Sequence, residues 1–114
     1  MNNMEYWGEI PNFDGRYLIS VNGELLDTKS DRIIKPHMSG VPRRNYPQVT
    51  LYKVGVDKST KHTKRVHSLM AVTFLGHKYG DRKIVIDHID NDPLNNKLSN
   101  LQVISMKLNN TKDR

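Results

Sequence analysis

The stretch "IVIDHIDNDPLNNKLSNL" (residues 84–101) decides how this chain folds. Its β-branched beginning, residues 84–86, predicts a buried strand, and that strand ends in an acid and an imidazole, Asp87 and His88. The next tract, "DNDPLNN", is rich in turn-forming residues, and "LQVIS" (residues 101–105) predicts a returning strand. The sequence therefore predicts a hairpin that carries Asp87 and His88 at the end of its first strand.

Three kinds of feature put acids and amides together in this way: a calcium loop, a structural turn and a catalytic site. A calcium loop of the EF-hand type needs a bidentate glutamate at its twelfth position. Counted from Asp90, that position holds Leu101; counted from Asp87, Ile89 already stands where an oxygen ligand is needed. A turn accounts for "DNDPLNN" but not for the Asp-His pair that precedes it. A catalytic or metal site at the strand end accounts for both.

The first half of the chain predicts a meander of short antiparallel strands. Asn22-Gly23 is its strongest turn signal. The expected strands are residues 17–21, 24–27, 31–37, 48–54 and 62–66. Trp7, Phe13 and Tyr17 are expected to form a small core there.

Helical spacing replaces strand alternation at residue 66. The residues at that spacing are Val66, Leu69, Met70, Thr73 and Phe74. They predict an amphipathic core helix over residues 67–75, with Gly76 just past its end. A second, short helix is expected in "SMKLNNTK" (residues 105–112), with Ser105 as its N-cap.

The composition limits the class of protein. The chain has 114 residues, 36% of them hydrophobic, a mean hydropathy of −0.68 and no cysteine, which excludes a disulfide framework and a thiolate zinc site. The N-terminus "MNNMEYWGEI" shows no secretory signal, and no apolar run approaches the ~18 residues of a membrane span. We expect a cytoplasmic protein that is neither secreted nor membrane-embedded.

The positive charge is concentrated just before the Asp-His stretch. Of the net +6, residues 56–83 hold seven Lys or Arg against two Asp or Glu. A solvated lysine-rich loop is one interpretation, and a surface that contacts a phosphate backbone is the other. The position beside a candidate site favours the second interpretation. The expected DNA-contacting residues are Arg43, Arg44, Lys58, Lys61, Lys64 and Arg65.

The motifs "VHSLMAVTFLG" and "IVIDHIDNDPLNNKLSNLQVISMKLNN" together resemble the HNH nucleases, in particular the small homing endonucleases of phages and introns. The matching parts are Asp87-His88, the "DNDPLNN" loop, Asn100-Leu101 and Asn109. One departure is Asn91, where the family usually has glycine; asparagine tolerates the left-handed conformation that such a position requires. The N-terminal "EYWGEIPNFDGRYLISVNGELL" resembles a modular motif that precedes HNH domains and is thought to contact DNA.

The resemblance implies an α+β fold in which N-terminal short antiparallel strands precede a ββα-metal nuclease module. We expect residues 4–55 to form the DNA-binding motif. Residues 56–114 are expected to form the nuclease domain, including the basic lead-in and the helix at 67–75.

The geometry of a strand suits hydrolysis of a phosphodiester. Successive side chains point to opposite sides, so Asp87 and His88 should serve different partners. A metal held by Asp87 can stabilise the leaving oxygen, while His88 accepts a proton from the attacking water. By the resemblance, Asn109 is the second metal ligand and Asn100 supports the catalytic strand by bonding across the loop. Two oxygen ligands with water and phosphate favour Mg²⁺ or Mn²⁺.

The expected function is therefore a metal-dependent endonuclease acting on double-stranded DNA, phage-encoded and working in the cytoplasm of an infected host. His67 matches a family position and is expected to have a structural or DNA-contacting role. The sequence leaves open nicking against double-strand cutting, and a monomer against a homodimer. A catalytically silent DNA-binding module on the same scaffold is the alternative.

Overall fold

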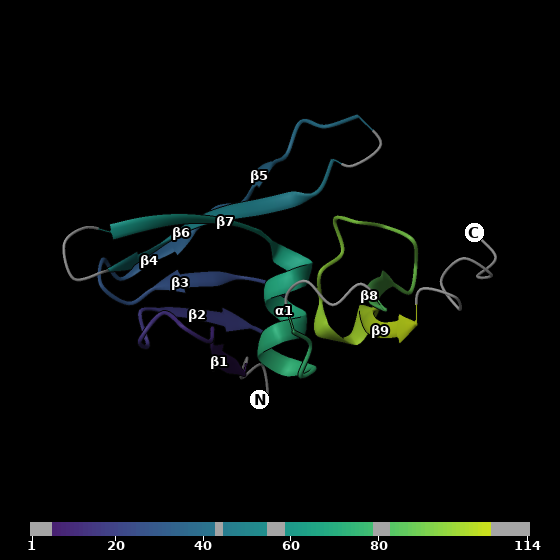
Figure 1. The fold of residues 1–114 in the computed structure, drawn as a ribbon, viewed down its shortest axis with the longest axis horizontal. Coiled ribbons are helices and arrows are strands. Elements are labelled where there is room, and N and C mark those ends of the chain that lie inside the picture. The colour runs from purple at the N-terminus through teal and green to yellow at the C-terminus, as the bar shows by residue number, and fades with distance from the viewer. Residues whose placement is uncertain (1–5, 43–44, 55–58, 79–82, 106–114) are drawn as a thin grey trace.

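The computed structural model describes residues 6–42, 45–54, 59–78 and 83–105. Within these ranges the strands form three antiparallel sheets, and Figure 1 shows helix α1 between the two larger sheets and the small third one. The first sheet has the order β1 (Trp7–Glu9), β2 (Tyr17–Ser20), β3 (Leu25–Asp27), β4 (Arg32–Ile34). The second has the order β5 (His37–Met38), β6 (Pro47–Val54), β7 (Ser59–Arg65). Helix α1 (Val66–Phe74) follows, and β8 (Ile84–His88) pairs with β9 (Leu101–Ser105) after a short 3-10 turn, η1 (Leu98–Asn100).

The predicted turn at Asn22-Gly23 joins β2 to β3. Gly23 has a φ of +85°, a conformation that glycine adopts without the strain of a Cβ. The Ser20 hydroxyl accepts hydrogen bonds from the backbone N–H of Asn22 (3.1 Å) and Glu24 (3.2 Å). These bonds satisfy turn amides that the ladder cannot pair, and they fix the hairpin register that sets Ile19 opposite Leu25.

Helix α1 is the centre of the hydrophobic core. Its buried face carries Val66, Leu69 and Met70, as the helical spacing predicts. Phe13 and Tyr17 belong to the same core, and the backbone N–H of Tyr52 donates to the Tyr17 hydroxyl at 2.9 Å, which ties the first two sheets together. The remaining members are Ile10, Ile19, Leu25, Val49, Leu51 and Leu101.

That core draws on both halves of the chain. Ile19 and Leu25 come from the predicted N-terminal unit, while Leu69 and Leu101 come from the predicted nuclease unit, and all four are at most 5% exposed. The division into residues 4–55 and 56–114 stays a prediction. The packing implies that the two parts stabilise each other.

The sequence places most elements correctly and misses the shortest. Helix α1 begins at Val66, one residue before the predicted start, and Gly76 follows it with a φ of +69°, as expected of a residue that ends a helix. Strands β1 and β5 are not predicted, because three and two residues are too few to show alternation. The second predicted helix (105–112) begins at Ser105, which is the last residue of β9; the rest of it lies outside the described residues. No helix among the described residues has the length and apolarity needed to cross a membrane.

The shared core predicts that one truncation in α1 destabilises the whole fold. Leu69 is fully buried, so Leu69→Ala should lower the free energy of unfolding by about 2–5 kcal/mol. Ile33→Ala, at a side chain that is 53% exposed, should cost less than about 1 kcal/mol. Urea unfolding followed by circular dichroism and by Trp7 fluorescence measures both. Two separate transitions in the wild type would contradict a common core.

Candidate active site at the end of strand β8

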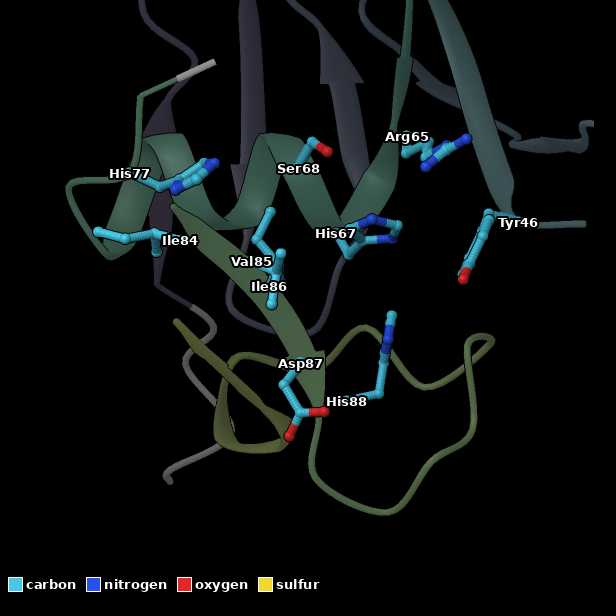
Figure 2. Close-up of a pocket in the computed structure, with 10 residues that line it drawn as sticks. All are labelled: Tyr46, Arg65, His67, Ser68, His77, Ile84, Val85, Ile86, Asp87 and His88. Atoms are coloured by element: carbon cyan, nitrogen blue, oxygen red, sulfur yellow. The ribbon is translucent and has the colours of Figure 1, made fainter. Parts of the chain in front are cut away.

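An open pocket of about 370 Å³ lies where β8 ends beside the start of α1. Figure 2 shows its lining, in which β8 supplies one wall and the first turn of α1 the other. The polar residues around it are Tyr46, Arg65, His67, Ser68, His77, Asp87 and His88. The pocket therefore gathers the Asp-His pair predicted from the sequence with Tyr46, which immediately precedes β6, and with residues of β7 and α1.

Asp87 and His88 leave β8 in different directions. In Figure 2 the His88 ring rises toward His67, while the Asp87 carboxylate points away from it. This divergence is what the alternation of side chains along a strand requires. Both side chains are buried, with 2% of Asp87 and 8% of His88 exposed, so each depends on polar partners within the protein.

The carboxylate of Asp87 is held by the opposite strand. Gln102 stands across from it in the β8–β9 register, and the Gln102 side-chain amide donates to Asp87 Oδ2 at 2.9 Å. That bond uses one of about four lone-pair positions of a carboxylate. An oriented, buried carboxylate beside an open pocket is a suitable oxygen ligand for a hard divalent cation.

The imidazole of His88 has a buried amide as its partner. Its Nε2 lies 2.8 Å from Oδ1 of Asn96, and Asn96 is itself 7% exposed. The His88 ring also meets the ring of His67 edge-to-face, with 5.1 Å between centroids. The ring plane is thus fixed from two sides.

His67 belongs to a row of stacked side chains that leads out of the pocket. Its ring meets Tyr46 edge-to-face at 5.1 Å, and the Arg65 guanidinium lies 4.9 Å from the centre of the Tyr46 ring. Burial, and after it the charges of His88 and Arg65, lowers the pKa of His67 from 6.5 to about 3. An imidazolium donates from both nitrogens, yet Nδ1 of His67 is buried without a partner among the described residues. His67 is therefore a neutral side chain at physiological pH.

The loop between β8 and β9 is closed by Asn100. Its Oδ1 accepts from the backbone N–H of Asp90 (3.1 Å), and its Nδ2 donates to Asp90 Oδ1 and to the Asn95 carbonyl, both at 2.9 Å. The Asn100 carbonyl accepts from the N–H of Ile89 at 2.8 Å. These bonds hold the backbone directly after His88, and the supporting role predicted for Asn100 stays a prediction.

The acids of the loop serve the turn itself. Asp90 Oδ1 accepts from the N–H of Asp92 (2.8 Å), and Asp92 Oδ1 accepts from the N–H of Leu94 (3.0 Å). Hydrogen bonds from Asn95 first, then from the Asp92 amide and Asn100, hold the pKa of Asp90 below its usual value. Asn91 has a φ of +64°, as its replacement of the family glycine requires. In the described ranges no group of three His, Cys, Asp or Glu side chains could hold a metal ion.

The basic residues predicted to contact DNA divide between two faces of β7. Lys61 and Arg65 are exposed on one face, and Lys64 lies on the other, where it lines a hollow with Phe13 and His62. Arg65 also lines the pocket beside His88. Arg43, Arg44, Lys58 and the predicted second ligand Asn109 lie outside the described residues.

Sequence reasoning did not identify Asn96, Gln102 and Tyr46 as site residues. Gln102 follows from the strand register, but twelve residues separate His88 from Leu101, and a loop of that length does not fix the register. In the sequence Asn96 cannot be distinguished from the other turn-forming residues of its tract. Tyr46 lines the pocket only because of tertiary packing, which the sequence does not indicate.

Residues 64–111 match a protein-family model described as HNH endonuclease. The chain is similar to DNA endonuclease I-HmuI of Bacillus phage SP01, with 33% identity over 104 residues, 90% of this chain and 54% of that protein. It is also similar to H-N-H endonuclease F-TflII of Escherichia phage T5, with 32% identity over 102 residues, 90% of this chain and 49% of that protein. The chain thus spans about half the length of these relatives.

The fold is similar to a solved structure described as "DNA binding and cleavage by the HNH homing endonuclease I-HmuI". The TM-score is 0.75 at 31% identity, and the match covers 93% of this chain and 56% of that one. The match extends over nearly the whole chain, so it includes the N-terminal strands as well as β8, β9 and α1.

The depressed pKa of His67 predicts a specific acid sensitivity. Between about pH 6.5 and pH 3 the unfolded chain binds a proton at residue 67 that the folded protein does not, so stability falls as the pH falls, by up to about 1.4 kcal/mol per pH unit. His67→Phe keeps a ring but cannot titrate. It should reduce the slope of the unfolding free energy against pH by the contribution of one proton. Unfolding by urea at several pH values measures the slope. Parallel curves for the two proteins would contradict a buried neutral His67.

Proposed function

The chain contains a domain of the HNH endonuclease family, and from that premise we propose that it is a metal-dependent, homing-type endonuclease that hydrolyses phosphodiester bonds of double-stranded DNA. The observation that carries this proposal is the divergent pair Asp87 and His88, both buried at the rim of one open pocket. An acid and an imidazole on opposite sides of one strand end can act on opposite sides of a phosphorus atom, as in-line displacement requires.

His88 is the proposed general base. A neutral imidazole accepts a proton near physiological pH. The Asn96 amide oxygen and the ring of His67 both contact the His88 ring and keep it oriented toward the pocket. The orientation matters because a base contributes to catalysis when it is already aimed at the proton that it accepts.

Asp87 is the proposed metal ligand. Its carboxylate fits a hard cation, since it is buried at the pocket and its Oδ2 is oriented by Gln102. A Mg²⁺ or Mn²⁺ ion bound there would supply charge stabilisation for the oxygen that leaves phosphorus. Asn109 is proposed as the second protein ligand, and Asn100 as the residue that keeps the loop closed behind His88.

The exposed face of the β6–β7 hairpin is the proposed DNA-binding surface. Cross-strand partners on this face are Gln48 with Arg65, Thr50 with Thr63, and Tyr52 with Lys61. All carry hydrogen-bonding side chains suited to phosphate and base edges. The row ends at Arg65, which lines the catalytic pocket, so a duplex lying along the hairpin would reach the pair of catalytic side chains. Arg43, Arg44 and Lys58 are proposed as further backbone contacts.

The similarity to two phage proteins supports a phage-encoded protein that acts in the host cytoplasm.

Cleavage of supercoiled plasmid tests the proposal. The protein with Mg²⁺ should give relaxed or linear DNA, and EDTA should abolish the reaction. His88→Ala should lower the rate by roughly 10²–10⁴-fold, the usual contribution of a general base.

Ser99→Ala is the matched control, because Ser99 is exposed in the same loop; it should cleave at the wild-type rate. Undiminished cleavage by pure His88→Ala protein would refute the general-base assignment. Salt-dependent DNA binding without cleavage, on any divalent metal and on DNA from the source genome, would instead establish the silent DNA-binding module.

The binding surface predicts a measurable salt dependence. Lys61→Ala and Arg65→Ala should each reduce the slope of log K against log salt by about one, the effect of losing one phosphate contact. Lys29→Ala, at an exposed position in the β3–β4 turn, should leave the slope unchanged. Filter binding in EDTA at several salt concentrations separates binding from cleavage. Equal slopes for all three variants would place the DNA elsewhere.

A further inference from the structure

The hydrogen-bond partner of His88 determines which ring nitrogen of His88 carries the hydrogen. Asn96 Oδ1 lies 2.8 Å from His88 Nε2, and an amide oxygen accepts but does not donate. The hydrogen of a neutral imidazole must then be on Nε2, and the lone pair must be on Nδ1. The contact therefore selects one of two tautomers of His88.

Asn96 is held in place by the N-terminal sheet. The backbone N–H of Leu98 donates to the Val21 carbonyl at 2.7 Å. Gly23 packs so closely that a Cβ there would lie 3.2 Å from the Asn96 carbonyl oxygen. The turn between β2 and β3 thus packs closely against the segment that contains Asn96.

The preceding residue is fixed from the opposite direction. The Asn95 carbonyl accepts from Asn100, and the Asn95 amide donates to Asp90 Oδ2 at 2.8 Å. The acceptor, Asn96 Oδ1, is therefore buried, and hydrogen bonds of Asn95 and Leu98 hold the backbone before and after it. Such an acceptor can orient a ring, whereas an exposed amide would exchange its partner for water.

We propose that Asn96 is a positioning residue that fixes His88 as the Nε2–H tautomer, so that Nδ1 carries the lone pair that accepts the proton of the attacking water. The assignment of Nδ1 as the reacting atom rests on the proposed endonuclease function. The assignment of the tautomer rests only on the contact between His88 and Asn96. The reaction is balanced: water loses a proton to Nδ1 as its oxygen attacks phosphorus, and the 3′-oxygen leaves with the electrons of the broken bond. Asn96 accepts the Nε2–H throughout and touches neither water nor DNA.

Nitrogen-15 NMR of the histidine rings tests the tautomer in the absence of DNA and metal. Long-range proton–nitrogen correlations, recorded at about pH 8.5, distinguish Nε2–H from Nδ1–H. The wild type should show the Nε2–H form of His88. Asn96→Ala should show a mixture of both forms, and Asn96→Asp, which can accept but not donate, should restore the Nε2–H form.

Cleavage rates test the positioning role. Asn96→Ala should lower the single-turnover rate by about 10- to 100-fold, as is usual for a residue that orients a catalytic group, with the DNA dissociation constant unchanged. Asn96→Asp should stay within about threefold of the wild type at pH 8.5. Ser99→Ala is the neighbouring control, and circular dichroism shows whether each variant is folded.

Each outcome decides the proposal. A wild-type His88 in the Nδ1–H form would overturn it, and so would an Asn96→Ala protein that keeps the tautomer and the rate. If Asn96→Ala does not fold, the tautomers of His88 in the wild type and in Asn96→Asp are compared instead. The proposal requires the Nε2–H form in both proteins, and the Nδ1–H form in either would overturn it. A wild type that cleaves no DNA would refute the proposed function, whereas the NMR measurement would still decide whether Asn96 sets the tautomer.

Discussion

A two-stranded sheet cannot by itself hold a buried acid and a buried imidazole, and this constraint organises the molecule. Isolated hairpins are marginal in water, and burying polar groups costs free energy unless partners are supplied. Strands β8 and β9 meet the constraint by packing on α1, with Leu101 in the common core. The polar groups are then paired locally, Asp87 with Gln102 and His88 with Asn96.

The same constraint involves the N-terminal sheet, which also supports the segment next to His88. Its hairpin turn contacts the loop between β8 and β9 through the bond from Leu98 to Val21 and the close approach of Gly23 to Asn96. Its core residues share one cluster with Leu69 of α1. A segment expected to contact DNA therefore also supports the loop behind His88. Substitutions in that turn are expected to affect chemistry as well as binding.

Local signals sufficed for the hairpin at Asn22-Gly23, the core face of α1, and Asp87-His88 at the end of β8, since each depends on a few neighbouring residues. The left-handed Asn91 and the bracing geometry of Asn100 followed from the family resemblance. The partners Asn96 and Gln102 did not, because they depend on the path and register of a twelve-residue loop. The contacts of His67 with Tyr46 and His88 likewise join elements that are distant in sequence. The role of Asn109 stays a prediction.

The central claim is that the strand end carries the chemistry and that the acids of the loop form the turn. Paramagnetic broadening by Mn²⁺, titrated into nitrogen-15-labelled protein without DNA, tests it directly. The account predicts that the first amide signals to broaden are those of Asp87 and its partner Gln102, and that Asp87→Asn abolishes the effect. Broadening centred on Asp90 and Asp92, and unchanged in Asp87→Asn, would contradict it.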